Sequence, residues 1–157
     1  MDSNPFQQVV GYWEEVIEDM EITAAEYREA GWDVVELHPG DVAVLDEEQY
    51  GFDVLVPDDE FDQLEAAISN ATLNDTEIYR AEQDGFIFAL AVIFDSDNEI
   101  AVCYPLYYSS ENTIELRKQV EQTNQLDTII RTLSNERAIT ISHDDPVSFF
   151  PEHPGSN

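Results

Sequence analysis

An uninterrupted run of nine apolar residues, from Phe86 to Phe94, constrains the fold more than any other part of this chain. A membrane-spanning helix needs about 18 apolar residues, so the run has the length of a strand. A strand without alternating polar residues is buried on both faces and lies inside a sheet. The run is therefore predicted to be a central strand.

Turn signals on both sides of this run predict neighbouring strands. Asp84–Gly85 is a dipeptide typical of two-residue hairpins, and it joins the run to a strand over Glu77–Ala81. Asp95–Asn98 turns the chain into another strand over Ile100–Tyr104. A further hairpin is predicted for residues 126–142.

Apolar residues spaced by three and four predict a long N-terminal helix over Pro5–Ala30. Similar patterns and capping residues predict two shorter helices and three more strands. The helices are expected at 58–68 and 111–123, and the strands at 32–37, 41–45 and 52–56. His38–Gly40 is expected to form a hairpin turn or short loop between the first two of these strands.

Together these elements predict an α+β fold, with a long N-terminal helix and two shorter helices packed on a mostly antiparallel sheet of six to eight strands. Residues 1–150 are expected to form a single domain, and residues 151–157 a flexible C-terminal tail. The order strand, proline, helix, hairpin occurs twice, beginning near residues 52 and 100. A duplicated β-α-β-β unit would explain this, but chance alternation is the alternative because the halves share little residue identity.

The charge of the chain is strongly one-sided. Thirty-five Asp and Glu face six Lys and Arg, which gives a net charge of -29. Repulsion of this size should destabilise a compact state in dilute buffer, whereas at molar salt the Debye length falls to about 3 Å and screens it. The composition, with Lys118 as its one lysine, therefore predicts a protein of a salt-filled, halophilic cytoplasm. The alternative is an acidic mimic of nucleic acid that inhibits a DNA-binding protein.

Several classes of protein are disfavoured by the sequence. The chain has no basic patch for binding nucleic acid or anionic lipid directly, and no acidic loop of the calcium-binding type. Its single cysteine, Cys103, has no partner for an internal disulfide or a cysteine-based zinc cluster. No secretory signal and no membrane helix are predicted, so a soluble, cytoplasmic protein is expected.

Three segments of the sequence carry a resemblance. They are WEEVIEDMEITAAEYREAGWDVVELHPGDV, which begins at Trp13, FDVLVPDDEFD, and the late SHDDP. This pattern resembles a haloarchaeal family of small acidic proteins of unknown function, from Trp13 to Phe150. The resemblance implies a haloarchaeal source and a single compact domain, and it transfers no catalytic residue, cofactor or substrate.

His143 and Asp144 are the most suggestive residues for chemistry, because a histidine beside carboxylates can bind a divalent metal or act as a base. Further ligands could come from elsewhere in the fold: His38, Glu36, Asp41 or Glu82. A simpler interpretation is a turn in which Asp144 or Asp145 caps the segment that follows. A small metal-assisted hydrolase is therefore an alternative function, and no cofactor is expected.

Four aromatic residues are the candidate binding residues: Trp13, Tyr104, Tyr107 and Tyr108. Tyr and Trp are favoured at interfaces because they combine a large contact area with a polar group. The competing interpretation is that these rings pack inside the protein. The leading hypothesis is a non-catalytic interaction or regulatory module that contacts a protein partner or a second copy of itself; an enzyme is less expected.

Overall fold

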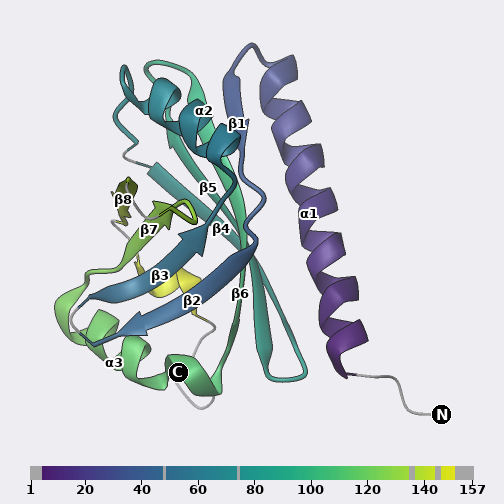
Figure 1. Ribbon diagram of the computed structural model, residues 1–157, viewed down its shortest axis with the longest axis vertical. Coiled ribbons are helices and arrows are strands. Elements are labelled where there is room, and N and C mark those ends of the chain that lie inside the picture. The colour runs from purple at the N-terminus through teal and green to yellow at the C-terminus, as the bar shows by residue number, and fades with distance from the viewer. Residues whose placement is uncertain (1–4, 48, 74, 135–136, 144–145, 151–157) are drawn as a thin grey trace.

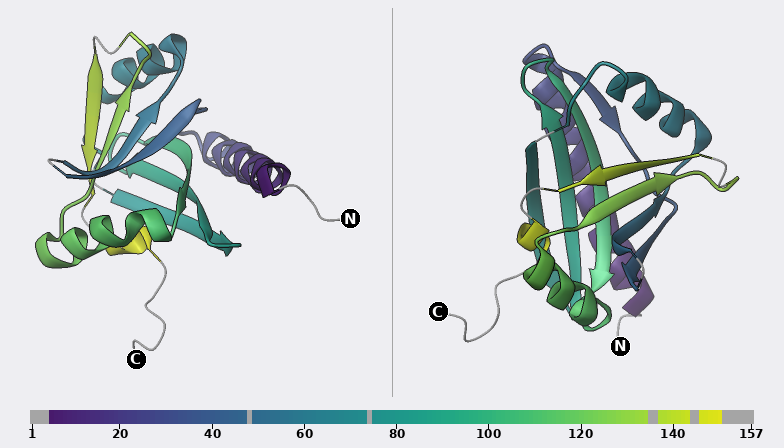
Figure 2. Two further views of the ribbon diagram at one scale, coloured as in Figure 1. Left: turned by 60° about the horizontal axis from the view of Figure 1, so that its bottom comes forward. Right: turned by 90° about the vertical axis from the view of Figure 1, so that its left-hand side faces the viewer.

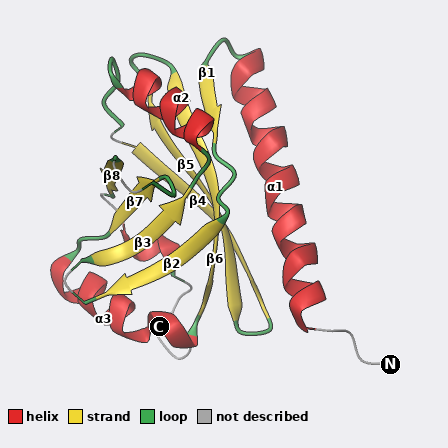
Figure 3. Cartoon of the chain, viewed as in Figure 1, coloured by secondary structure: helices red, strands yellow, loops and turns green. Residues whose placement is uncertain are grey.

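The structure, a computed structural model, describes residues 5–47, 49–73, 75–134, 137–143 and 146–150. These residues form three α-helices and eight strands, which confirms the predicted α+β class (Figures 1 and 3). The helices are α1 (Pro5–Glu29), α2 (Asp58–Ile68) and α3 (Ile114–Thr123), and short 3₁₀ helices lie at η1 (Glu111–Thr113) and η2 (Pro146–Phe149). The strands are β1 (Asp33–Glu36), β2 (Asp41–Asp46), β3 (Tyr50–Leu55), β4 (Asp75–Gln83), β5 (Phe86–Asp95), β6 (Ile100–Ser109), β7 (Asp127–Arg131) and β8 (Ala138–Ser142).

The strands form two sheets of four, not the single sheet that was expected. Sheet A has the order β1-β6-β5-β4, and sheet B has the order β2-β3-β7-β8. Each sheet is mixed, since β1 pairs with β6 and β3 pairs with β7 in parallel, while the other neighbours are antiparallel. As predicted, β5 is an interior strand, and Asp84 and Gly85 turn the chain with φ angles of 52° and 84°.

Alternation along β5 explains why its apolar run is uninterrupted. One set of side chains faces sheet B and belongs to the main core: Ile87, Ala89, Ala91 and Ile93. The intervening set faces α1: Phe88, Leu90, Val92 and Phe94. Helix α1 covers one face of sheet A and sheet B covers the other, so both faces of the strand need apolar residues (Figure 2).

Of the two alternatives predicted for His38–Gly40, the short loop is present and the hairpin turn is wrong, because the strands on either side belong to different sheets. β1 pairs with β6 in sheet A, and β2 pairs with β3 in sheet B. The link between them is tied to a different sheet at each end: Leu37 N donates to Cys103 O at 2.9 Å, and Gly40 N donates to Leu55 O at 2.8 Å. Leu37 is fully buried, so the link crosses the edge of the core instead of turning back at the surface.

The duplicated unit is present in the order of elements but not in their pairing. β3, α2, β4 and β5 are followed by β6, α3, β7 and β8. β3 and β6 are the first strands of the two halves, so they should pair in the same way if the halves were equivalent. However, β6 pairs antiparallel with β5, whereas β3 pairs in parallel with β7. The two halves therefore do not build equivalent structures.

Helices α2 and α3 lie at opposite ends of the space between the sheets (Figure 1). Phe61 and Leu64 of α2, and Leu116 and Val120 of α3, are fully buried in the main core. No helix in the described part of the chain has both the length and the apolarity needed to cross a membrane. The predicted tail, residues 151–157, lies outside the described residues.

Candidate functional site

Trp13 and Tyr107 come together where the first half of α1 crosses β5 and β6. Their rings meet edge to face, with centroids 5.4 Å apart, and Tyr107 stacks on Phe88 at 6.1 Å. Tyr12 and Phe86 also contact Phe88, at 5.4 and 6.5 Å. We call these five residues the aromatic cluster. Trp13 and Tyr107 are half-buried, so each keeps part of its surface available for contact.

Tyr104 and Tyr108, the other two candidate binding residues, lie in the core between the sheets. Tyr104 is fully buried and Tyr108 is 3% exposed. The Tyr108 hydroxyl donates to the backbone carbonyl of Phe149. Because alternate residues of a strand point to opposite faces, Tyr107 faces α1 while its neighbours face sheet B. The alternation along β6 was the sequence signal that could have separated them.

A groove runs between α1 and β4, beside the aromatic cluster. It consists of two adjoining hollows of about 290 and 440 Å³ that share Thr23 and Tyr79. Its apolar lining includes Val16, Ile22, Tyr79, Phe88, Leu90 and Trp32, and its acidic lining includes Asp19 and Glu26. Ile22 and Tyr79 are 55% and 53% exposed, which is unusual for large apolar side chains on facing elements. We call this the α1–β4 groove.

The groove is bordered by the edge of sheet A. β4 is nine residues long and is the last strand of the sheet order, with most of its residues exposed. Gln83 and Phe86 flank the two-residue turn and form a hydrogen-bonded pair of the β4–β5 ladder. Along an antiparallel ladder such pairs alternate with pairs whose backbone N–H and C=O groups point away from the partner strand. The backbone groups of Ile78, Arg80 and Glu82 therefore point outward. The Tyr79 hydroxyl donates to Glu77 at 2.5 Å, and this hydrogen bond raises the pKa of Tyr79 to about 12.

His143, a predicted metal ligand, is instead part of a buried hydrogen-bonded chain between the sheets. The Tyr104 hydroxyl donates to Thr128 Oγ1 at 3.0 Å, and Thr128 Oγ1 lies 2.8 Å from His143 Nε2. His143 Nδ1 lies 3.4 Å from Thr76 Oγ1. The Tyr104 and Thr128 hydroxyl hydrogens both have an acceptor if Thr128 donates to Nε2, an arrangement that requires the neutral form of His143. Burial lowers the pKa of His143 to about 4, consistent with this form. Its proposed partner Asp144 lies outside the described residues.

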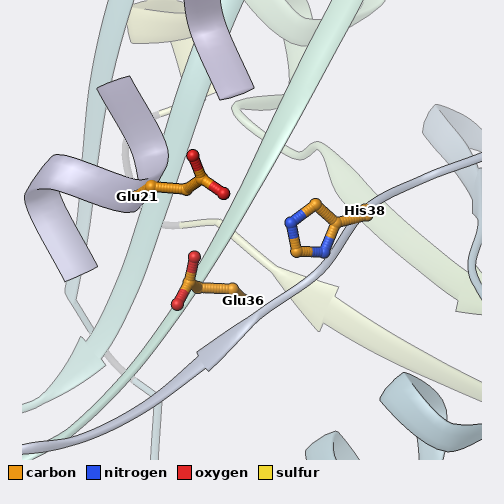
Figure 4. Close-up of side chains that lie close together, drawn as sticks. All are labelled: Glu21, Glu36 and His38. Atoms are coloured by element: carbon orange, nitrogen blue, oxygen red, sulfur yellow. The ribbon is translucent and has the colours of Figure 1, made fainter. Parts of the chain in front are cut away.

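His38, the other predicted histidine ligand, lies on the opposite side of α1 from the groove. Its ring faces the carboxylates of Glu21 on α1 and Glu36 on β1 (Figure 4). One potential ligand atom from each residue lies within 4.8 Å of the other two. We call these three residues the His38 cluster. It is the only such group of three or more His, Cys, Asp or Glu residues within the described ranges, and it includes neither Asp41 nor Glu82.

Two residues that the sequence reasoning did not single out support this cluster. Glu60 of α2 accepts the His38 backbone N–H through Oε1 at 2.5 Å, and its Oε2 lies 2.8 Å from His38 Nδ1. Arg28 of α1 donates to Glu36 Oε2 at 2.5 Å and to the Val34 carbonyl at 3.1 Å. Among 35 acidic residues, no spacing in the sequence identifies Glu21 and Glu60 as neighbours of His38. Only the packing of α1 and α2 brings them there.

Cys103 is not available as a nucleophile in this fold. Its side chain is fully buried between sheet A and α1. Burial raises the pKa of the thiol to about 12, so the reactive thiolate is not formed near neutral pH. Cys103 therefore packs as a small apolar residue of the core.

The fold and these features define an α+β protein with two mixed sheets, an open groove beside an edge strand and a separate His–carboxylate cluster. The chain belongs to a family of unknown function, DUF7529, whose model matches residues 3–151. Searches of curated proteins and of solved structures found no match. Family membership assigns no activity, so a function has to be argued from the groove and the cluster.

Proposed function

We propose that the protein is a non-catalytic interaction module of a salt-rich cytoplasm, which binds an extended segment of a partner protein along β4. The observation that carries this proposal is the α1–β4 groove beside the outer edge of the nine-residue strand β4, which pairs with no second strand in the described part of the chain. An extended peptide can add to such an edge through main-chain hydrogen bonds, while alternate side chains enter neighbouring pockets. The outward backbone groups of β4 can make the main-chain hydrogen bonds, and the groove can receive the side chains.

The lining of the groove suggests what such a segment would carry. Ile22, Tyr79 and Leu90 favour apolar side chains. Asp19 and Glu26 favour positive charge on the same segment, since they outnumber the one basic residue of the lining, Arg80, which donates to the Ser148 carbonyl at 3.0 Å. A segment in which apolar residues alternate with Lys or Arg meets both conditions. The half-buried rings of Trp13 and Tyr107 extend the apolar surface through Phe88, which belongs to both the groove and the aromatic cluster.

Salt-rich surroundings favour this mode of recognition over simple charge attraction. At about 1 M salt the Debye length is near 3 Å, so long-range steering is lost. Apolar contacts and main-chain hydrogen bonds keep their strength under these conditions. The acidic rim would then select a partner at short range, and the apolar lining would provide most of the affinity.

The test is titration of a fluorescent peptide of alternating Val and Lys, about as long as β4, at about 1 M KCl, where diffuse charge attraction is screened. We expect Ile22→Lys to weaken binding by about tenfold or more, because it places a like charge in the groove. Ile114→Lys is the matched control, since Ile114 on α3 is 52% exposed and does not line the groove. Glu82→Pro should also weaken binding by removing an outward N–H without breaking a bond to β5.

Equal binding by the Ile22→Lys and Ile114→Lys variants would refute the proposed site. A peptide of alternating Val and Glu should bind much more weakly than the lysine peptide, and equal binding would refute the charge argument. If light scattering instead shows a dimer that Ile22→Lys dissociates, the occupant is a second copy of the chain and the assignment to a partner segment is wrong.

A further inference from the structure

We propose that the His38 cluster binds one divalent transition-metal ion of the Zn²⁺ type, with His38, Glu21 and Glu36 as its protein ligands. This site is independent of the α1–β4 groove, because Glu21 and Arg28 lie on the flank of α1 that faces β1. One imidazole nitrogen and two carboxylates form a donor set suited to such an ion. Three protein ligands also leave a coordination position for water.

The support of His38 by Glu60 determines which ring nitrogen is free. Glu60 is an acceptor in its ionised form, so His38 Nδ1 carries the hydrogen of the 2.8 Å contact. In the neutral imidazole Nε2 then has the lone pair, and it faces the two carboxylates across the cluster (Figure 4). Histidines that bind metals usually donate their other ring N–H to a carboxylate or carbonyl, which fixes the tautomer and the orientation of the ring. Glu60 provides this arrangement before any metal binds.

Arg28 plays the corresponding part for Glu36. It is held against β1 by the Val34 carbonyl and contacts only Oε2 of the carboxylate among the bonds described. Oε1 of Glu36 is then available to a metal while Oε2 keeps its ion pair. The Arg28 charge also reduces the repulsion between Glu36 and Glu21, which lets the two carboxylates approach each other.

The separations within the cluster are close to those of a metal site. Ligand atoms about 2.1 Å from a tetrahedral ion are about 3.4 Å apart. The three atoms of the His38 cluster already lie within 4.8 Å of one another, and Glu21 is an exposed side chain on a helix. Rotation of the Glu21 side chain can shorten its distances to the other two ligand atoms without moving the backbone. An ion here would connect α1 to the link between β1 and β2.

The experiment is isothermal titration of the full chain with Zn²⁺ at about 1 M KCl, which suppresses diffuse binding to the acidic surface. We expect one Zn²⁺ per chain, at least tenfold weaker binding in Glu21→Gln and His38→Gln, and an increase in melting temperature on Zn²⁺ addition in the wild type but in neither of these two variants. Glu14→Gln is the matched control, because Glu14 is an exposed residue of the same helix outside the cluster. It should bind Zn²⁺ within twofold of the wild type.

Circular dichroism of each variant checks that the fold is retained, and Glu21→Gln keeps the test valid if His38→Gln does not fold. Equal Zn²⁺ binding by Glu21→Gln and Glu14→Gln would overturn the proposal, as would a stoichiometry that changes with salt instead of staying at one. Displacement of Zn²⁺ by an equal concentration of Mg²⁺ would also overturn it, because a site with an imidazole ligand should prefer the transition metal.

Discussion

Acidification should destabilise this protein through His143 before most carboxylates are protonated. The buried ring has a pKa of about 4 in the folded state, against 6.5 for an ordinary histidine. The unfolded chain therefore binds a proton at a higher pH than the folded chain does. The stability linked to His143 is complete above pH 6.5 and is lost as the pH falls from 6.5 toward 4.

The size of this effect follows from the difference between the two pKa values. Each pKa unit corresponds to about 1.4 kcal/mol, so complete protonation would cost about 3 kcal/mol. About 2 kcal/mol of this should be lost by pH 5, which is still above the pI near 4.1. The structural reason is burial, which penalises the charged imidazolium. Protonation of Nε2 would also leave the Thr128 hydroxyl hydrogen without the acceptor that the neutral ring provides.

The assay is urea unfolding of the wild type and of His143→Gln at pH 7.5 and pH 5, at one fixed salt concentration. The variant removes the titrating ring and leaves the surface carboxylates unchanged, so the difference between the two pH dependences isolates His143. We expect the wild type to lose about 2 kcal/mol more than the variant between these pH values. An equal loss in both proteins would refute the assignment of a neutral, buried His143.

Two further predictions concern the backbone and the surface charge. Gly51→Ala should lower the free energy of unfolding by about 3 kcal/mol or more, because its Cβ would lie 1.7 Å from the Asp127 carbonyl oxygen and φ at this position is +153°. Gly11→Ala should instead raise the free energy of unfolding by about 0.5–1 kcal/mol, because Gly11 lies inside α1 and its Cβ would meet nothing within 4 Å. Urea unfolding of both variants measures the two changes. Thermal melts followed by circular dichroism should show stability rising between about 0.1 M and about 3 M KCl as repulsion is screened. A melting temperature unchanged over this range would favour the acidic mimic of nucleic acid over adaptation to salt.

The elements that could be predicted were those specified by neighbouring residues. The hairpin at Asp84–Gly85 and the interior position of β5 follow from turn chemistry and from an apolar run, and both are present. The separation into two sheets could not be predicted, because it depends on β1 pairing with β6 and β3 with β7. Nothing near His38–Gly40 shows that β1 pairs with the distant β6 while β2 pairs with the next strand, β3.

The candidate residues divided in the same way. Alternate side chains of a strand point to opposite faces of the sheet, so the sequence of β6 alone predicts that Tyr107 lies on the other face from Tyr104 and Tyr108. The predicted binding surface instead combined all these aromatic residues. The metal hypothesis named His38 and Glu36, whose side chains lie close together, but it combined them with His143, which the fold places in the core. Glu21 could not be identified, because a single carboxylate on an acidic helix has no distinguishing pattern.

The parallel pairs also determine how the chain can fold. Asp33 pairs with Ile100, and Gly51 pairs with Asp127, so neither sheet can be completed by a continuous stretch of chain. Closing such long loops is costly in entropy and slows folding. The meander β4–β5–β6 is the largest set of strands joined by local turns, which makes it the natural starting point. The strands of the two sheets alternate along the chain, so no single cleavage of the chain separates one complete sheet from the other. We therefore expect that neither fragment of a cleaved chain can fold by itself.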